Sequence, residues 1–397
     1  MSRSLLASPD ATAGPLVPPS VYLGFAVASI GGPLALAAIY LPGAADPRSA
    51  GLFALVGGAL YALPLAVWLR YSEEIVSAGG LAAFVEAAVG RRAALAQAAI
   101  WSFSYFLYLP YTVSDVVYEM LGDVFPGIHP WRPVLQIALP VAIVAFVLLR
   151  VTTVLRVLLL SAVVQLALVL ILAFVMLQHG GAPAASFTRV PSVGHLARGS
   201  SNVALLFLCG SLPLFLGAEV VGGARTVRRT LVVAGLVVAG YLVFAAWPLA
   251  AVDPSLTHAN LPGYEIASAY SGRTLAIAIG VGGAASVTGL IVAEYLALSR
   301  LLHAVTRIPI RKLVLWIGAP FVAFDGLSLI DPESFDKNVL RPSLVALFLS
   351  QLIVFGVFPV YRARRGRLTA VDVVIAAGAF ALMAWGLYRA VTHPLST

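Results

Sequence analysis

Eleven long apolar runs dominate this 397-residue chain and exclude most folds. A helix that crosses a lipid bilayer needs about 17 to 25 mostly apolar residues, and each run meets that length. The runs cover residues 20–41, 51–71, 93–120, 133–149, 152–177, 201–222, 230–252, 274–298, 312–330, 340–360 and 369–391. Of all residues, 60% are hydrophobic and 11% are charged, against about 25% charged in soluble domains. We therefore expect an all-α integral membrane protein with about 11 transmembrane helices.

The Lys and Arg residues are unevenly distributed over the segments between these runs. If the N-terminus is cytoplasmic, the inner segments hold 17 of the 25 basic residues and the outer segments hold 8. Cytoplasmic loops of membrane proteins carry such an excess. The net charge of +8 is thus explained by topology and requires no nucleic-acid partner. The Pro/Ala/Ser-rich residues 1–19 are expected to form a disordered cytoplasmic tail.

Little in the sequence suggests chemistry on a cofactor or metal. The single cysteine, Cys209, excludes a disulfide framework, and no Cys/His cluster has metal-ligand spacing. No Ser/His/Asp or paired-carboxylate arrangement appears, so we expect no enzyme, no cofactor and no metal site. The Arg-rich, Lys-poor composition with its Ala/Gly/Leu bias suggests a prokaryotic protein of the cell membrane.

Two spans carry glycine and proline in their middle. Span one contains SIGGP at residues 29–33, and span six contains CGSLP at residues 209–213. Proline removes a backbone donor and glycine admits other dihedral angles, so both helices are expected to break. The breaks lie five spans apart, as two inverted five-helix repeats require, and transporters bind substrate at such paired breaks. The alternative is that both are ordinary kinks of membrane helices.

Three stretches resemble the amino acid–polyamine–organocation (APC) transporter superfamily. Residues 62–65 (ALPL) and 71–91 (YSEEIVSAGGLAAFVEAAVGR) are similar to its "ALP…AEL…P.AGG.Y…G" stretch, with Ser77 replacing a proline and Leu81 an aromatic residue. Residues 215–219 (FLGAE) resemble "F.GFE", and 299–307 (SRLLHAVTR) resemble "SR.LYA.AR". The usual acidic segment after span six is replaced by GGARTVRR, so the chain resembles a divergent member.

The resemblance implies the five-plus-five inverted-repeat fold of the leucine transporter, working by alternating access with proton or sodium coupling or by exchange. Residues 20–360 would form the ten-helix core, with repeats at about 20–177 and 201–360. Residues 361–397 would carry one extra transmembrane helix outside that core.

An amino acid presents a carboxylate and an ammonium group to its binding site. Backbone N–H groups at a half-helix N-terminus bind the carboxylate, while carbonyls and hydroxyls accept from the ammonium. We therefore expect the substrate site at the two breaks, formed by Ser29, Ile30, Gly31, Gly32, Cys209, Gly210, Ser211 and Phe215. Tyr108, the middle member of an aromatic stripe in span three, would close over the substrate. The alternative is that this stripe is a packing seam.

Three ionisable residues lie within spans, where an unpaired buried charge costs several kcal/mol. In the fold that the resemblance implies, the inner halves of helices one, five and eight meet at a cation site. We hypothesise that Arg156 occupies this site and pairs with Glu294. The alternative is that Arg156 reaches out to the cytoplasm. Glu219 is expected to have a structural role, either capping the second half-helix or holding an inner gate through Arg225 or Arg228.

Together these features favour a secondary transporter of neutral or zwitterionic amino acids, with H⁺ or Na⁺ and membrane lipid as further partners. A polyamine carrier would need more acidic groups facing the cavity than Glu219, Glu294 and Asp115 supply. A transport-inactive sensor of the same fold is the other alternative. A channel would need a filter or a ring of charges, and the sequence shows neither.

Overall fold

The computed structural model describes residues 4–5 and 16–392. Ten helical segments of this part are long and apolar enough to cross a membrane. They are Pro19–Ala44, Pro47–Tyr71, Pro126–Val147, Val151–Gly180, Val193–Glu219, Gly223–Ala251, Arg273–Thr306, Ile310–Leu329, Lys337–Arg364 and Ala370–Thr392. Within the described residues, the β-structure consists of a single isolated bridge between Val17 and Val220.

The span predicted at residues 93–120 is also a long helix, although it is more polar than these ten. It consists of α6 (Arg91–Ser114) and a π-helical stretch (Asp115–Met120). It packs against α5 (Gly80–Val89), α15 (Arg273–Thr306) and α17 (Pro332–Arg364), and buries polar residues such as Gln97 and Ser104. Its polarity therefore reflects a position inside the bundle, and the all-α membrane fold with about eleven long helices is confirmed.

Span one is broken at the predicted place. It consists of α1 (Pro19–Ser29), α2 (Pro33–Ala35), a π-helical stretch (Leu36–Tyr40) and α3 (Leu41–Ala44). Between α1 and α2 the backbone passes through Gly31 and Gly32, whose φ angles are 72° and 67°. Glycine adopts such angles without a steric penalty, and Pro33 then suits the first position of the next helix.

Span six is broken as well, and its inner half has an uncommon geometry. The outer half is α11 (Val193–Leu205), and the inner half, η6, is a 3₁₀-helix over Leu208–Glu219. Runs of 3₁₀-helix longer than about four residues are uncommon, so twelve residues in this form mark a segment under local constraint. Pro213 within it cannot donate the backbone hydrogen bond that an α-helix would need there.

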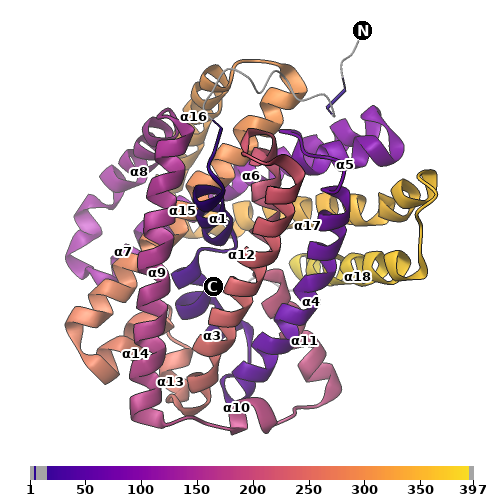
Figure 1. Cartoon of the computed structure of the whole chain (residues 1–397). Helices are drawn as coiled ribbons and strands as arrows, with labels where there is room; N and C mark the ends of the chain where they lie inside the picture. Colours follow the sequence, from indigo (N-terminus) through magenta and orange to yellow (C-terminus); the bar gives the residue numbers. More distant parts are fainter. Residues whose placement is uncertain (1–3, 6–15, 393–397) are drawn as a thin grey trace.

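The remaining helices surround these two (Figure 1). They include α4 (Ala50–Tyr71), α8 (Arg132–Val147), α9 (Val151–Gly180), α12 (Gly223–Ala246), α14 (Pro262–Ser271), α16 (Ile310–Gly326) and α18 (Ala370–Thr392). Helix α1 packs against α9, α12 and α15, which places its break at the centre of the bundle. Helix α16 runs without interruption into a 3₁₀ turn (Leu327–Leu329), so the ninth predicted span is a full-length helix.

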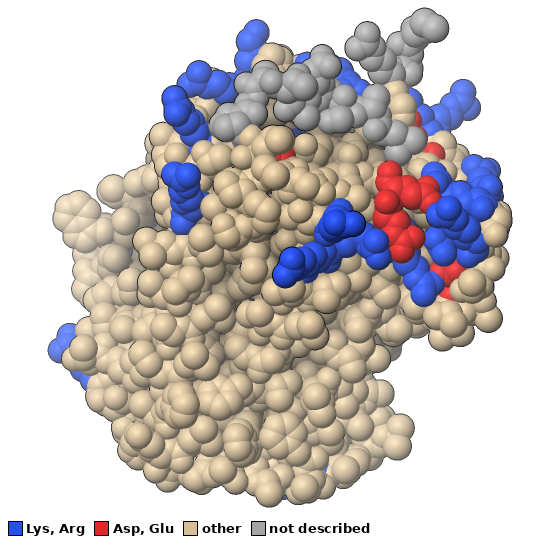
Figure 2. All heavy atoms as spheres, viewed as in Figure 1, with Lys and Arg blue, Asp and Glu red and all other residues tan. Residues whose placement is uncertain are grey.

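The surface charge agrees with the predicted orientation. Figure 2 shows Lys and Arg gathered at the upper and right-hand side of the view, where acidic residues also lie, while the remainder of that face is almost uncharged. Part of this cluster is an ion-pair network between the end of α17 and the residues after α4, including Arg362–Glu73 and Arg367–Glu74. An excess of basic residues is what the predicted cytoplasmic side would carry, and this side is called the inner side below.

Most of the predicted disordered tail, residues 1–3 and 6–15, lies outside the described residues. The described residues of this segment contact the rest of the chain. The backbone N–H of Leu5 donates to Glu86 and its carbonyl accepts from Ser77, and the Leu5 side chain is buried. Val17 exchanges backbone hydrogen bonds with residues 219 and 221, at the end of η6. The start of the chain thus contacts the inner end of span six.

Candidate functional site

A cavity of about 380 Å³ lies on the outer side of the two breaks. Gly31 and Cys209 lie at its inner end, one from each break. Its walls come from the outer halves of span one and α11, from Tyr108 on α6, from Leu290 on α15, and from α17 and α18. The cavity therefore connects the broken helices with the outer ends of the bundle, and it is large enough for a small organic solute.

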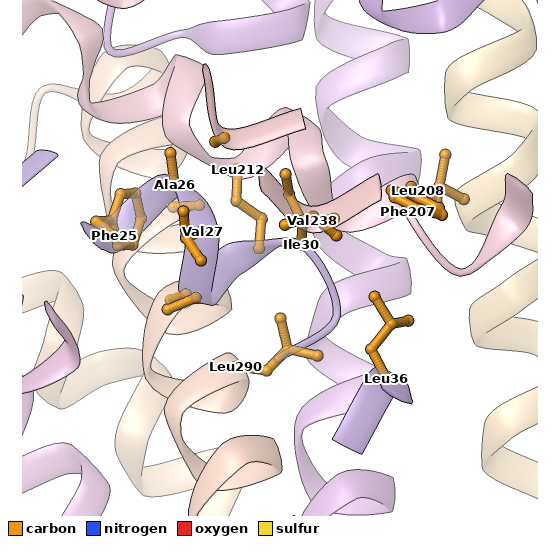
Figure 3. Close-up of a cluster of buried hydrophobic side chains, with 14 of the residues drawn as sticks. Phe25, Ala26, Val27, Ile30, Leu36, Phe207, Leu208, Leu212, Val238 and Leu290 are labelled. Carbon is orange, nitrogen blue, oxygen red and sulfur yellow. The ribbon is translucent and has the colours of Figure 1, made fainter. Parts of the chain in front are cut away.

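Around the breaks the packing is mainly apolar. Figure 3 shows Ile30, Leu36 and Leu290 beside the unwound segment of span one, with Phe207 and Leu208 of span six nearby. Ile30 is 1% exposed, and both Leu36 and Leu208 line the cavity. The polar groups available to a solute at this level are thus few, and the backbone of the breaks is prominent among them.

The exception is a buried acidic group behind the cavity wall. Glu294 on α15 is 0% exposed, and its Oε1 accepts from the Cys209 thiol at 3.8 Å. The Tyr105 hydroxyl contacts the same sulfur at 3.8 Å, so a chain of polar atoms leads from α6 through Cys209 to the carboxylate. Glu294 Oε2 is buried and has no hydrogen-bond partner among the described residues. A carboxylate in this position must be neutralised or bear a substantial desolvation cost.

The predicted binding residues divide into three groups. Gly31, Tyr108 and Cys209 line the cavity. Ile30, Gly32, Gly210 and Ser211 lie behind them in the packed wall; Gly32 abuts Ser286, and the Ser211 hydroxyl accepts from Gln351 at 3.5 Å. The structure does not place Ser29 and Phe215 at the cavity.

Ser29 and Phe215 have internal partners, which corrects their predicted role as binding residues. The Ser29 hydroxyl donates to the carbonyl of Phe25 at 2.7 Å, one turn back in the same helix. The Phe215 ring is fully buried against Trp101, with ring centroids 4.5 Å apart. It lies six residues after Cys209 along η6, towards the inner side, and it closes the floor of the site instead of contacting a solute.

The predicted ion pair between Arg156 and Glu294 is absent from the described structure. Arg156 on α9 has an exposed side chain, whereas Glu294 is fully buried against Cys209. Where α1, α9 and α15 pack together, leucine side chains fill the space. A Cβ atom on Gly24 would lie 2.3 Å from Leu159, and one on Gly289 would lie 3.4 Å from Leu158. Arg156 lies on the exposed face of α9 with Val157 and Leu160, whereas Leu155 and Leu158 belong to its buried face.

Glu219 has an ion-pair partner on the inner side, but it is neither of the predicted ones. Arg300 on α15 donates to both carboxylate oxygens of Glu219, at 2.8 and 3.2 Å, and is only 4% exposed. Arg228 instead pairs with Glu73. The Glu219–Arg300 pair joins the end of η6 to the inner part of α15, and the backbone bridge from Val17 adds the start of span one. The site is therefore closed towards the inner side.

A second contact joins the outer halves of spans one and three. The hydroxyl of Tyr40 donates to Asp115 at 3.3 Å, and both residues lie in π-helical stretches. Such stretches occur often at functional sites. The sequence did not point to Tyr40, Tyr105 or Arg389 as site residues. Tyr105 belongs to the aromatic stripe of span three that includes Tyr108, while the other two have no local signature.

Solved structures with the same overall fold are transporters. The chain superposes on the Eremococcus coleocola manganese transporter, in complex with an aromatic bis-isothiourea substituted compound, with a TM-score of 0.64 and 11% identity over 94% of this chain and 86% of that one. It superposes on MhsT in complex with L-phenylalanine with a TM-score of 0.60 and 16% identity, over 98% of this chain and 99% of that one. The chain has the fold of these transporters.

A Na⁺-coupled sialic acid symporter, in a substrate-bound outward-open state, is a third neighbour, with a TM-score of 0.57 and 13% identity over 94% of this chain and 90% of that one. No protein-family model and no curated protein matches the sequence. The fold shared with these three solved structures confirms the five-plus-five architecture with broken helices one and six. Membership of the APC superfamily stays a prediction.

Cys209 provides a direct test of access to the cavity, because it is the single cysteine of the chain. We expect a membrane-impermeant methanethiosulfonate to label it faster from the outer side than from the inner side. The outer route passes through the cavity, whereas Phe215 and the Glu219–Arg300 pair close the inner one. Labelling of right-side-out and inverted vesicles measures the two rates, with Cys209→Ser as the control for background. Equal rates from both sides would contradict this assignment.

Proposed function

We propose that the protein is a secondary transporter of amino acids or closely related zwitterions, coupled to protons through Glu294. The observation that carries this proposal is the buried carboxylate of Glu294 with its unpartnered Oε2, directly behind the cavity residue Cys209. The shared fold supports a transporter in general, and the features of the site support the substrate and the coupling ion.

A zwitterion fits the broken helices for an electrostatic reason. Each break brings together the C-terminus of one half-helix and the N-terminus of the next: Ser29 and Pro33 in span one, Leu205 and Leu208 in span six. Helix N-termini attract negative groups and C-termini attract positive ones. A carboxylate and an ammonium group on neighbouring atoms of one solute would satisfy both kinds of helix end. The mainly apolar surroundings favour a substrate that carries no further charge at this level.

A proton suits Glu294 better than a substrate ammonium group does in this conformation. Glu294 is 0% exposed and separated from the cavity by Cys209, so a proton can reach it by way of Tyr105 and Cys209 whereas a solute cannot. Sodium is less favoured, because Leu158 and Leu159 fill the inner part of the junction of α1, α9 and α15, and the side-chain oxygens of Ser286 and Gln165 further out are hydrogen-bonded to each other. A divalent metal as substrate is also less favoured, since no group of three or more His, Cys, Asp or Glu that could hold one occurs in the described residues.

We expect Glu294→Gln to abolish proton-driven accumulation while leaving exchange of substrate across the membrane intact. Glutamine keeps the shape and a hydrogen-bond partner for Cys209 but cannot gain or lose the proton. In proteoliposomes, a pH gradient of one unit drives up to about tenfold accumulation by a one-proton symporter, and the variant should fall to equilibration. Radiolabelled amino-acid uptake and counterflow measure the two activities.

The matched control is Glu265→Gln, which removes an exposed carboxylate on α14, away from the cavity. It should accumulate substrate as the wild type does. Accumulation driven by a sodium gradient and indifferent to pH would exclude Glu294 as the coupling group while leaving transport in place. Saturable binding without any flux, in protein that remains folded, would instead favour the sensor alternative.

A further inference from the structure

The eleventh long helix, α18, forms part of the cavity wall. Gly386, Arg389 and Ala390 line the cavity together with residues of spans one and six. The resemblance predicts this helix outside the ten-helix core. It packs instead against α4, α11 and α17 (Figure 1), two of which belong to spans two and six.

Several contacts fix the position of α18 beside the cavity. Near its outer end, the indole N–H of Trp385 donates to Asn202 of α11 at 3.5 Å, and Asn202 itself lines the cavity. Arg341 of α17 donates to the carbonyl of Ala390 at 3.1 Å. Gly386 lies against Phe348, so close that an added Cβ would be 2.6 Å from the ring. At its inner end, Asp372 is buried and paired with Arg70 and Arg362.

Arg389 is the one charged side chain among the described residues that line the cavity. It lies in the last turn of α18, and the structure shows no ion-pair partner for it among the residues it describes. An arginine that reached out to the lipid headgroups would lie on the outer surface of the bundle, whereas this one faces the route to the breaks. A guanidinium is permanently charged and recognises carboxylates through two parallel hydrogen bonds.

We propose that Arg389 is a charge filter in the outer part of the route to the site, where it favours substrates that carry a carboxylate and disfavours purely cationic amines. The positive charge at the outer part of the cavity would attract the carboxylate of a zwitterion as it enters. The identity of the substrate rests on the proposed function above, but the charge preference of the cavity does not.

The first test therefore needs no transport. It measures the rates at which Cys209 reacts with three methanethiosulfonates added from the outer side: anionic sulfonatoethyl, cationic trimethylammonioethyl and neutral hydroxyethyl. In Arg389→Gln the ratio of anionic to neutral rates should fall at least about threefold, and the ratio of cationic to neutral rates should rise. Arg389→Lys should stay close to the wild type. Arg273→Gln removes an exposed arginine from the outer end of α15 and should change neither ratio.

The wild-type protein offers a second measurement in case Arg389→Gln does not fold. Added salt screens an accessible charge, so the anionic-to-neutral ratio of the wild type should fall as ionic strength rises. Three results would each overturn the proposal. They are labelling-rate ratios that are unchanged in Arg389→Gln, ratios that change equally in Arg273→Gln, and a wild-type anionic-to-neutral ratio that does not respond to salt.

The second test measures transport. For an amino acid, Arg389→Gln should raise KM about tenfold, the effect of losing one charge-assisted hydrogen bond, with kcat close to the wild-type value. The corresponding decarboxylated amine should compete for uptake no worse in the variant than in the wild type. An equal loss for both compounds would contradict the role of Arg389 in recognising a carboxylate. If the wild type carries none of the compounds while the labelling ratios respond as expected, the proposed function fails and the charge filter stands.

Discussion

Gly32→Ala is expected to abolish transport and to destabilise the protein. Gly32 has a φ of 67°, where a residue with a Cβ is strained by about 1–2 kcal/mol. The added Cβ would lie 2.5 Å from the Ser286 Oγ and 2.9 Å from the Ser286 carbonyl oxygen, and forcing a methyl group into packed space costs a further 1–3 kcal/mol, roughly. Because Ser286 also accepts from the backbone N–H of Ala35 and donates to Gln165, the shift would spread to α9.

Thermal unfolding in detergent and uptake into proteoliposomes measure the two effects of Gly32→Ala. Gly240→Ala is the matched control, since Gly240 lies in α12 with a helical backbone and nothing within 4 Å of its added Cβ. There alanine should leave transport unchanged and stability equal or slightly higher. Wild-type uptake by Gly32→Ala would show that the break in span one does not need its positive φ.

The sequence was sufficient to predict the elements whose causes are local. Apolar runs give the long helices because only a helix satisfies every backbone group in lipid. Gly31, Gly32 and Pro33 give the first break, because glycine and proline determine the backbone at their own positions. The second break lies at Leu206 and Phe207, just before the predicted Gly210 and Pro213, which fall inside η6. The polar helix α6 was recognised by its length, although polar residues such as Gln97 and Ser104 lower its overall apolarity.

The contacts between helices were harder to predict, since they depend on the rotation of each helix about its axis. On α9, Arg156 lies on the exposed face and Leu155 and Leu158 lie on the buried face, and the apolar sequence around them does not distinguish the two faces. The partner of Glu219 was sought nearby in the sequence, at residues 225 and 228. The structure places it 81 residues away, at Arg300.

Nothing in the sequence indicated the 3₁₀ geometry of η6 or the position of α18 beside the cavity. A 3₁₀-helix rises about 2.0 Å per residue and an α-helix about 1.5 Å, so η6 reaches further towards the inner side than an α-helix of twelve residues would. This extra reach brings Glu219 to Arg300 and places Val220 beside Val17. The inner closure thus depends on a helix form that only the packed structure reveals.

Breaking the Glu219–Arg300 pair is expected to open the inner side of the site. In Glu219→Gln, Arg300 remains 4% exposed without its counter-charge, and removing one partner of such a pair costs about 2–3 kcal/mol here, where Glu219 is a quarter exposed. The cost applies to the inward-closed state, because opening lets water reach the guanidinium. The equilibrium should therefore move towards an inward-open state, and Cys209 should become labelled from the inner side at least about tenfold faster.

Two further variants separate this effect from a general loss of inner-side charge. Arg228→Gln breaks the half-exposed pair with Glu73 on the same side, and such pairs contribute about 0–1 kcal/mol, so inner labelling should stay slow. Exchanging the charges, Glu219→Arg with Arg300→Glu, should restore closure only in part, because Arg300 also donates to the Leu296 carbonyl at 3.2 Å and a glutamate there cannot. Unchanged inner labelling in Glu219→Gln would mean that the backbone bridge between Val17 and Val220 and the packed Phe215 hold the inner side closed without the ion pair.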